Sequence, residues 1–292
     1  MPWQAFILGL ILVTTAITIL EKFTLKREHA LQFLTALHFL LVGLALPLLF
    51  LVKINLNIQP IFWLWAIFPA LTISLASLFF TKSLRHLDVS EVLPMINFST
   101  VFTIIGAFII FKEHISPLQG LGIGLITFGA YVLEIGQWKN FLRPIKTLFI
   151  NLASKYQQFL FGAIILYAIT YLLDKWCLSQ IPIFSYFLII LFYSTLFYLF
   201  LTFVFYNGWS DVKKGFEAGG KFILPIAILT LIQILIWFKS ITIIPLALLV
   251  PSFRLHTLVA TLLGSRIFKE KHLFWRLFAA TLMIIGGFIV LR

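Results

Sequence analysis

Residues 89–133 read VSEVLPMINFSTVFTIIGAFIIFKEHISPLQGLGIGLITFGAYVL. This stretch holds two apolar runs, 89–111 and 117–137, separated by a short polar break. Each run is about 20 residues long, the length that an α-helix needs to cross the hydrocarbon core of a bilayer. Neither run alternates apolar with polar residues, which argues against membrane-spanning strands. The stretch therefore predicts two transmembrane helices, the second opened by Ser116 as N-cap and Pro117 in the first turn.

The rest of the chain has the same character. Hydrophobic residues make up 61% of its 292 residues and charged residues only 11%, whereas a soluble domain carries about 25% charged residues. Because so little charge cannot cover a water-facing surface, lipid must surround most of the chain. We therefore predict an all-α membrane protein with ten transmembrane helices. The predicted spans are residues 2–20, 30–52, 61–81, 89–111, 117–137, 157–174, 182–206, 221–238, 245–268 and 273–291.

The two halves of the sequence match each other. When the chain is shifted by 157 residues, KSLRHLDVSEVLP (82–94) aligns with KSITIIPLALLVP (239–251) and IFKE (110–113) aligns with IFKE (267–270). We therefore divide the chain into a first five-helix repeat, residues 1–137, an interfacial linker, residues 138–156, and a second five-helix repeat, residues 157–292.

The beginnings of the two halves also correspond. Glu21-Lys22-Phe23 aligns with Asp174-Lys175-Trp176 at a shift of 153 residues. The first helix thus has a counterpart inside the chain, so we interpret it as a transmembrane span and not as a cleaved signal peptide.

Five helices is an odd number, and this has a topological consequence. A second copy of an odd-span unit must enter the bilayer from the opposite side. Two such copies are related by a pseudo-two-fold axis in the membrane plane, which is the inverted-repeat design of secondary transporters. Near-identical halves of opposite orientation can exchange conformations, so an inward-open and an outward-open state become similar in energy.

Together, residues 89–133 and the second copy ending in IFKEKHLFWRLFAATLMIIGGFIVL (267–291) resemble the drug/metabolite transporter (DMT) superfamily, EamA type. The resemblance extends over the chain in helix number, length and repeat. It implies a ten-helix basket around a central cavity and transport of small organic solutes such as amino acids, nucleotide sugars or drugs. It does not imply which solute. One departure is His38, which stands where the family usually has an arginine near the start of the second helix.

The net charge of +12 bears on partners and orientation. The basic residues lie in short breaks between apolar runs, so they fit anionic lipid headgroups better than nucleic acid. Of the 22 Lys and Arg residues, 16 lie on the side of the predicted membrane opposite the termini. This bias places both termini outside, whereas the family resemblance implies cytoplasmic termini. We expect a multi-pass protein of the bacterial inner membrane.

Arg254 is the residue that most strongly suggests a substrate site. It lies near the centre of the predicted ninth span, where a lone Arg costs about 2.5–3.5 kcal/mol even on lenient scales and must face a cavity or a partner. Its repeat counterpart is Asn97, and the counterpart of Thr257 is Thr100. A guanidinium fork suits a carboxylate or phosphate. Arg254 is therefore predicted either to bind an anionic or zwitterionic substrate or to bond helix carbonyls or an acid such as Glu91 or Glu134.

Other polar residues inside the predicted spans extend this candidate pathway. His256 and His38 either relay a proton in a coupled transport cycle or are hydrogen-bonded core histidines. Pro94 and Pro251 occupy matched positions and act either as hinges or as simple helix openers. The remaining candidates for the substrate pathway are Thr261, Tyr167 and Tyr171.

Charged and small residues at the helix ends suggest structural roles. Glu113 and Glu270 follow lysines at the ends of the fourth and ninth spans, and we favour a structural or gating salt bridge for each over contact with substrate. The glycines at 120, 122, 124 and 129 predict close helix packing in the fifth span.

The sequence contains no recognisable catalytic set. The motifs HExxH, GxSxG and GKS/T are absent, and the six histidines show no ligand spacing. We expect no enzymatic activity, no cofactor and no metal. The expected partners are a small-molecule substrate and membrane lipids, with proton coupling as a further option. A flippase of lipids or lipid-linked sugars, or a structural membrane subunit, is the alternative. Substrate identity, import or export, the coupling ion and the oligomeric state stay open.

Overall fold

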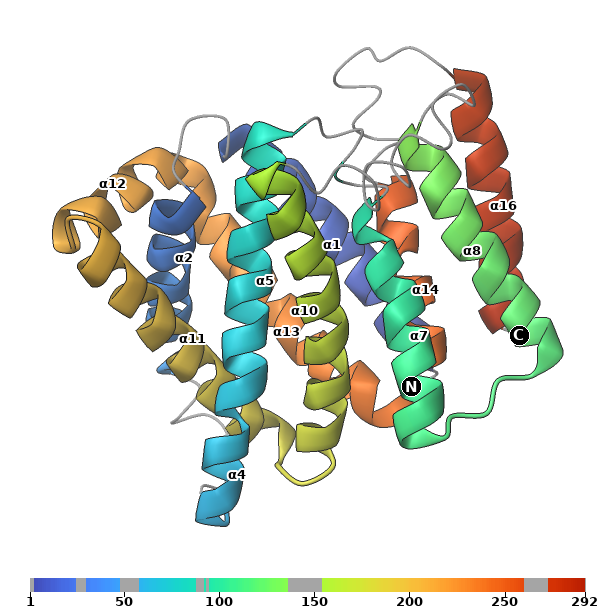
Figure 1. Cartoon of the computed structure of the whole chain (residues 1–292), viewed down its shortest axis with the longest axis horizontal. Coiled ribbons are helices and arrows are strands. Elements are labelled where there is room, and N and C mark those ends of the chain that lie inside the picture. Colours follow the sequence, from blue (N-terminus) through green and yellow to red (C-terminus); the bar gives the residue numbers. More distant parts are fainter. Residues whose placement is uncertain are drawn as a thin grey trace.

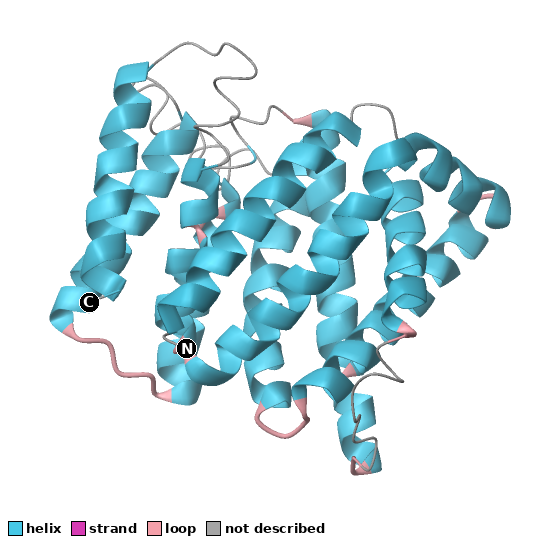
Figure 2. Cartoon of the chain, turned by 180° about the vertical axis from the view of Figure 1, so that it is seen from behind, coloured by secondary structure: helices cyan, strands magenta, loops and turns pink. Residues whose placement is uncertain are grey.

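A computed structural model describes residues 3–24, 30–47, 58–87, 92, 95–135, 154–259 and 273–291. In these ranges all regular structure is helical, as Figure 2 shows. The predicted linker lies almost entirely outside the described residues. The helices are α1 (Trp3–Thr24), α2 (Ala30–Ala45), α4 (Pro60–Trp65), α5 (Ile67–His86), α7 (Phe98–Phe111), α8 (Pro117–Ile135), α10 (Lys155–Leu178), α11 (Ile183–Phe205), α12 (Trp209–Gly219), the 3₁₀ turn η2 (Gly220–Phe222), α13 (Ile223–Ile243), α14 (Leu246–Phe253) and α16 (Leu273–Leu291).

Among the described residues, the apolar helices overlap the spans that the sequence predicts. Within the described residues, five apolar helical segments are long enough to cross a membrane, and five more are 10–17 residues long. The long segments are Trp3–Glu21, Pro60–Ser83, Lys155–Leu178, Ile183–Phe205 and Gly220–Ile243. The structure is thus that of an integral multi-pass membrane protein.

The start of α8 confirms the predicted capping signal. The backbone N–H of Gln119 donates to Oγ of Ser116 at 3.2 Å, and the backbone N–H of Ser116 donates to Oε1 of Gln119 at 3.1 Å. This reciprocal arrangement is a capping box, which satisfies backbone donors that a helix start otherwise leaves open. Pro117 occupies the first helical position, where its missing N–H costs nothing.

One helix, α12, lies where the sequence analysis placed only a connection. It follows α11 and packs on α2 at one edge of the bundle, as Figure 1 shows. Asp211 of α12 accepts hydrogen bonds from Nε2 of Gln32 in α2 and from the backbone N–H of Asn207, at 2.9 and 3.0 Å. Gly215 allows the two helices to touch, because a Cβ there would lie 2.2 Å from the carbonyl oxygen of Gln32.

Burial is distributed as expected for a protein surrounded by lipid. Large apolar side chains point outward, among them Ile109, Phe205 and Phe288. Buried positions, in contrast, include many polar groups. The interior thus carries the polarity and the outside carries the apolar surface, as a bilayer requires. The buried polar side chains in the apolar helical segments include Thr14, Thr35, Ser74, Asn97, Thr100, Thr103, Thr170, Asp174, Ser252 and Arg254.

Helices distant in sequence pair through the bundle. The largest helix–helix contacts are those of α8 with α16, α5 with α10 and α1 with α13, and α7 packs on both α10 and α14. α1 begins and α16 ends on the same side of the bundle, the side that carries the N and C labels in Figure 1. We call this side the terminal face.

Candidate functional site

Arg254 lies inside the bundle and is bonded to α7. Its Nε donates to Oγ1 of Thr100 at 2.9 Å, and its Nη2 donates to Oγ of Ser99 at 2.7 Å and to the carbonyl of Ile96 at 3.5 Å. Only 7% of the residue is exposed. Hydroxyl and carbonyl oxygens therefore replace water around a charge that lipid would not tolerate.

The helix tightens to a single turn at both repeat counterparts. α14 ends at Phe253, a turn follows at Arg254, and helix resumes over residues 255–259. The N–H of Arg254 is shared between the carbonyls of Val250 and Pro251 at 3.3 and 3.0 Å. A turn at Asn97 likewise precedes α7. Both turns therefore keep helical backbone conformation, and the polar groups at this depth are the side chains of Arg254 and Asn97.

Asn97 carries the most unusual side chain near this site. It is 3% exposed, and neither its Oδ1 nor its Nδ2 has a hydrogen-bond partner among the described residues. A buried polar group without a partner costs about 1–3 kcal/mol. Its chain neighbours Ile96, Ser99 and Thr100 hold Arg254, so the amide stands in the same stretch of chain as the ligands of the guanidinium.

Aromatic side chains connect α10, α13 and α14 beside Arg254. The rings of Tyr167 and Tyr171 lie 6.3 Å apart, those of Tyr171 and Trp237 4.9 Å, and those of Trp237 and Phe253 5.3 Å. Arg254 lies close enough to both tyrosine hydroxyls to interact with them electrostatically. The structure thus brings three of the predicted residues, Arg254, Tyr167 and Tyr171, into one neighbourhood.

The predicted histidines and Thr257 make contacts to their own helices. Nδ1 of His256 lies 2.6 Å from the carbonyl of Phe253, and Nδ1 of His38 lies 2.9 Å from the carbonyl of Leu34. Oγ1 of Thr257 donates to the carbonyl of Arg254 at 2.8 Å. These contacts fit the hydrogen-bonded alternative for each histidine.

The other predicted residues are only partly described. Pro251 lies within α14. The residues Thr261, Pro94, Glu91 and Glu270 lie outside the described residues, as does the side chain of Glu134.

Asp174 is a buried acidic residue that in the sequence stands out only through its match to Glu21 in the other repeat. It lies in α10, within a membrane-spanning segment, and its Oδ1 accepts a hydrogen bond from the hydroxyl of Tyr186 at 2.6 Å. The indole of Trp237 is a second hydrogen-bond partner. The signal was available in the sequence, because an acidic residue at the edge of an apolar run is a candidate functional group.

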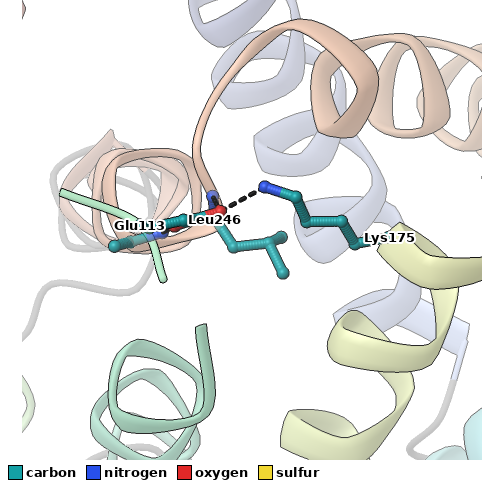
Figure 3. A network of polar contacts seen from close by, with 4 residues as sticks. Glu113, Lys175 and Leu246 are labelled. Atoms are coloured by element: carbon teal, nitrogen blue, oxygen red, sulfur yellow. Dashed lines mark hydrogen bonds and ion pairs between the residues drawn. The ribbon is translucent and has the colours of Figure 1, made fainter. Parts of the chain in front are cut away.

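Glu113 is the centre of a network of polar contacts at the terminal face, shown in Figure 3. Its Oε1 accepts the backbone N–H of Leu246 and its Oε2 that of Ala247, both at 2.9 Å. Oε1 also pairs with the ammonium of Lys175 from α10. A carboxylate at a helix start satisfies open N–H groups and the positive end of the helix dipole. The predicted salt bridge of Glu113 is therefore present.

Comparison with known proteins gives the family. The model of the EamA-like transporter family matches residues 1–135. Residues 1–135 thus match a family that lies within the DMT superfamily. The EamA-like family indicates a membrane transporter of the DMT type.

The likeness of fold extends beyond this EamA-like half. A solved structure described only as "Crystal structure of protein" covers 98% of this chain and 95% of its own, with a TM-score of 0.68 at 13% sequence identity. At this identity the likeness shows the fold alone.

No curated protein matches the sequence. Within the described residues, no three His, Cys, Asp or Glu side chains gather where they could hold a metal ion.

Proposed function

We propose that this protein is a secondary transporter that moves a small anionic or zwitterionic metabolite, such as an amino acid, across the membrane by alternating access. Two inverted five-helix repeats, residues 1–137 and 157–292, form the moving parts. The observation that carries the proposal is Arg254, a buried guanidinium bound by hydroxyls close in the chain to Asn97, whose amide has no partner among the described residues.

The pattern of helix contacts supports the inverted repeat. Under the proposed two-fold axis, α1 corresponds to α10 and α13 corresponds to α5. The axis therefore exchanges the pair α5–α10 with the pair α13–α1, and both pairs pack closely. It also maps each of the pairs α8–α16, α7–α14 and α2–α11 onto itself, and all three are in contact.

The chemistry around Arg254 supports an acidic substrate. A carboxylate accepts two parallel hydrogen bonds from a guanidinium, and these charge-assisted bonds are stronger than bonds to neutral hydroxyls. A substrate carboxylate is thus able to replace Ser99 and Thr100 as the partner of Arg254. The amide of Asn97 has both a donor and an acceptor to offer to the same ligand, and the rings of Tyr171 and Trp237 offer contact to its apolar part.

Transport assays with purified protein in proteoliposomes test the proposal. Uptake and efflux of labelled amino acids and carboxylic acids are measured with and without a pH gradient, which also tests coupling through His38 or His256. We expect Arg254→Gln to lower the initial rate of the transported solute by about tenfold or more, because a charge-assisted hydrogen bond contributes about 1.5–3 kcal/mol. Lys213→Gln, at an exposed position of α12, is the control and should leave the rate unchanged.

The variant Arg254→Lys tests whether the shape of the guanidinium matters in addition to its charge. A lysine keeps the charge but loses the planar fork, so we expect weaker substrate affinity than in the wild type. Full uptake by Arg254→Gln at normal expression would contradict the substrate site. Transport of lipid or a lipid-linked sugar, without transport of any soluble solute, would favour the flippase alternative. No transport of either kind would favour a structural subunit.

A further inference from the structure

Glu113, in the first half of the chain, binds three groups of the second half: the ammonium of Lys175 and the backbone N–H groups of Leu246 and Ala247. We propose that Glu113 is the latch of a gate at the terminal face, which holds the transport pathway closed on that side. This inference rests on the alternating-access function proposed above and adds a named gate to it.

The local backbone aims Glu113 at its partners. α7 ends at Phe111, and Lys112 adopts the left-handed conformation with φ 50°, which non-glycine residues seldom occupy. The chain turns sharply at this point, so that Glu113 points back across the bundle towards the start of α14, as Figure 3 shows. The ammonium of Lys175 also lies 5.2 Å from the ring centre of Phe111, and this cation–π contact holds Lys175 near the turn that follows α7.

Each ligand of Glu113 comes from the second half of the chain. Lys175 lies near the end of α10, and Leu246 and Ala247 form the first turn of α14. The carboxylate comes from the corner between α7 and α8, in the first half. The latch therefore joins parts that must separate if the two halves rock against each other. Separation would hydrate the charges it releases, whereas a buried carboxylate needs these partners.

The latch is connected to the candidate substrate site through α14. Arg254 lies eight residues beyond Leu246, about 12 Å along a helix at 1.5 Å per residue. Two sets of hydrogen bonds therefore join the α14 segment to the α7 region. At the terminal face Glu113 binds the start of α14, and deeper in the bundle Arg254 binds Ser99 and Thr100. A substrate carboxylate that takes Arg254 from its hydroxyl partners removes the deeper tie and so favours release of α14.

Thiol labelling measures the latch without knowledge of the substrate. Ala247 is fully buried and its backbone N–H binds Oε2 of Glu113, and Cys177 is the sole cysteine of the chain. In an Ala247→Cys, Cys177→Ser protein, a membrane-impermeant maleimide is applied from each side, using intact cells and inverted vesicles. We expect Glu113→Gln to speed labelling of position 247 from the terminal face by about tenfold, with little change from the other face.

Two further variants separate a latch from general instability. Lys175→Met removes the ion pair but leaves the bonds from Glu113 to α14, so it should speed labelling less than Glu113→Gln. Glu217→Gln removes the exposed ion pair between Lys213 and Glu217 and should change nothing. The apparent unfolding temperature of each variant is measured in parallel.

The outcomes are distinct. Unchanged labelling in Glu113→Gln, or labelling that rises equally from both faces together with a lowered unfolding temperature, would overturn the latch. If labelling behaves as expected but Arg254→Gln transports normally, the gate stands and the proposed substrate site fails. If Arg254→Gln abolishes transport while Glu113→Gln leaves labelling unchanged, the substrate site stands and the latch fails.

Discussion

Arg254 and Asp174 are ionisable residues buried inside the membrane, and hydroxyl groups bind both. Hydroxyls of Ser99 and Thr100 surround the guanidinium, and the hydroxyl of Tyr186 donates to the carboxylate. A ligand carboxylate can replace such a neutral hydroxyl, because a charge-assisted hydrogen bond is stronger than a bond to a neutral group. Glu113 differs, because Lys175 and two backbone N–H groups compensate its charge. This difference fits a ligand site at Arg254 and a structural tie at Glu113.

The pair Asp174–Tyr186 gives a prediction at this scale. Tyr186→Phe removes the donor at 2.6 Å but keeps the ring that packs on Phe238 at 4.9 Å. We expect a loss of about 1–3 kcal/mol in the stability of the folded protein, because the carboxylate stays buried with one donor fewer. Thermal unfolding in detergent measures the effect. Tyr193→Phe, on the same helix, is the control, and an equal loss in that variant would contradict the argument.

Among the elements, the contact between α8 and α16 depends on glycines that face each other. A Cβ added to Gly286 would lie 2.6 Å from the carbonyl oxygen of Gly122, and one added to Gly122 would lie 2.9 Å from the carbonyl oxygen of Gly286. Gly129 also faces α16, near Met283. Gly120 and Gly124, in contrast, have no atom within 4 Å of an added Cβ. The predicted close packing in the fifth span is therefore confirmed for part of the glycine run only.

The contrast between Gly286 in α16 and Gly124 in α8 gives a matched pair of variants. Gly286→Ala should destabilise the protein because the clash is with backbone, which cannot move aside as a flexible side chain can. Gly124→Ala should be neutral or slightly stabilising, because alanine favours a helix by about 0.8–1 kcal/mol over glycine. The apparent unfolding temperatures of the two variants are compared with that of the wild type. A larger loss in Gly124→Ala would refute this view of the interface.

The docking of α12 on α2 should depend on pH. The backbone N–H of Asn207 and then the ammonium of Lys214 lower the pKa of Asp211 below its ordinary value of 3.8. A lowered pKa means that the ionised carboxylate stabilises the fold above the unfolded-state pKa, and that this contribution is lost as the pH falls through the folded-state pKa.

The stability difference between wild type and Asp211→Asn tests this dependence. It should be constant from about pH 8 down to about pH 5 and shrink only at more acidic pH. Thermal unfolding across this range, with Glu217→Gln as control, measures it. A difference that already disappears near neutral pH would contradict the expected direction.

At the scale of the whole molecule, the distribution of Lys and Arg residues and the family resemblance predict opposite orientations in the membrane. The predicted loops opposite the termini hold 16 of the 22 Lys and Arg residues, which favours termini outside. The EamA-like resemblance favours termini in the cytoplasm. We expect the charge bias to decide, so that a C-terminal reporter active only in the cytoplasm stays silent and one active only outside gives signal. The opposite pattern would refute this orientation and place the Glu113 latch on the cytoplasmic side.

The sequence by itself determined the helical class, the ten apolar segments, their order and the cap at Ser116, because run length, charge content and capping residues are local properties. It also singled out Arg254 as a charge that needs a partner. The tertiary structure alone decided that this partner is the hydroxyl pair of α7, that Glu113 reaches the start of α14, and that Asp174 meets Tyr186. Which side chains meet depends on how each helix is rotated about its axis. A helix such as α11 is apolar on all sides, and lipid is as apolar as the bundle interior, so the sequence carries little periodic signal for that rotation.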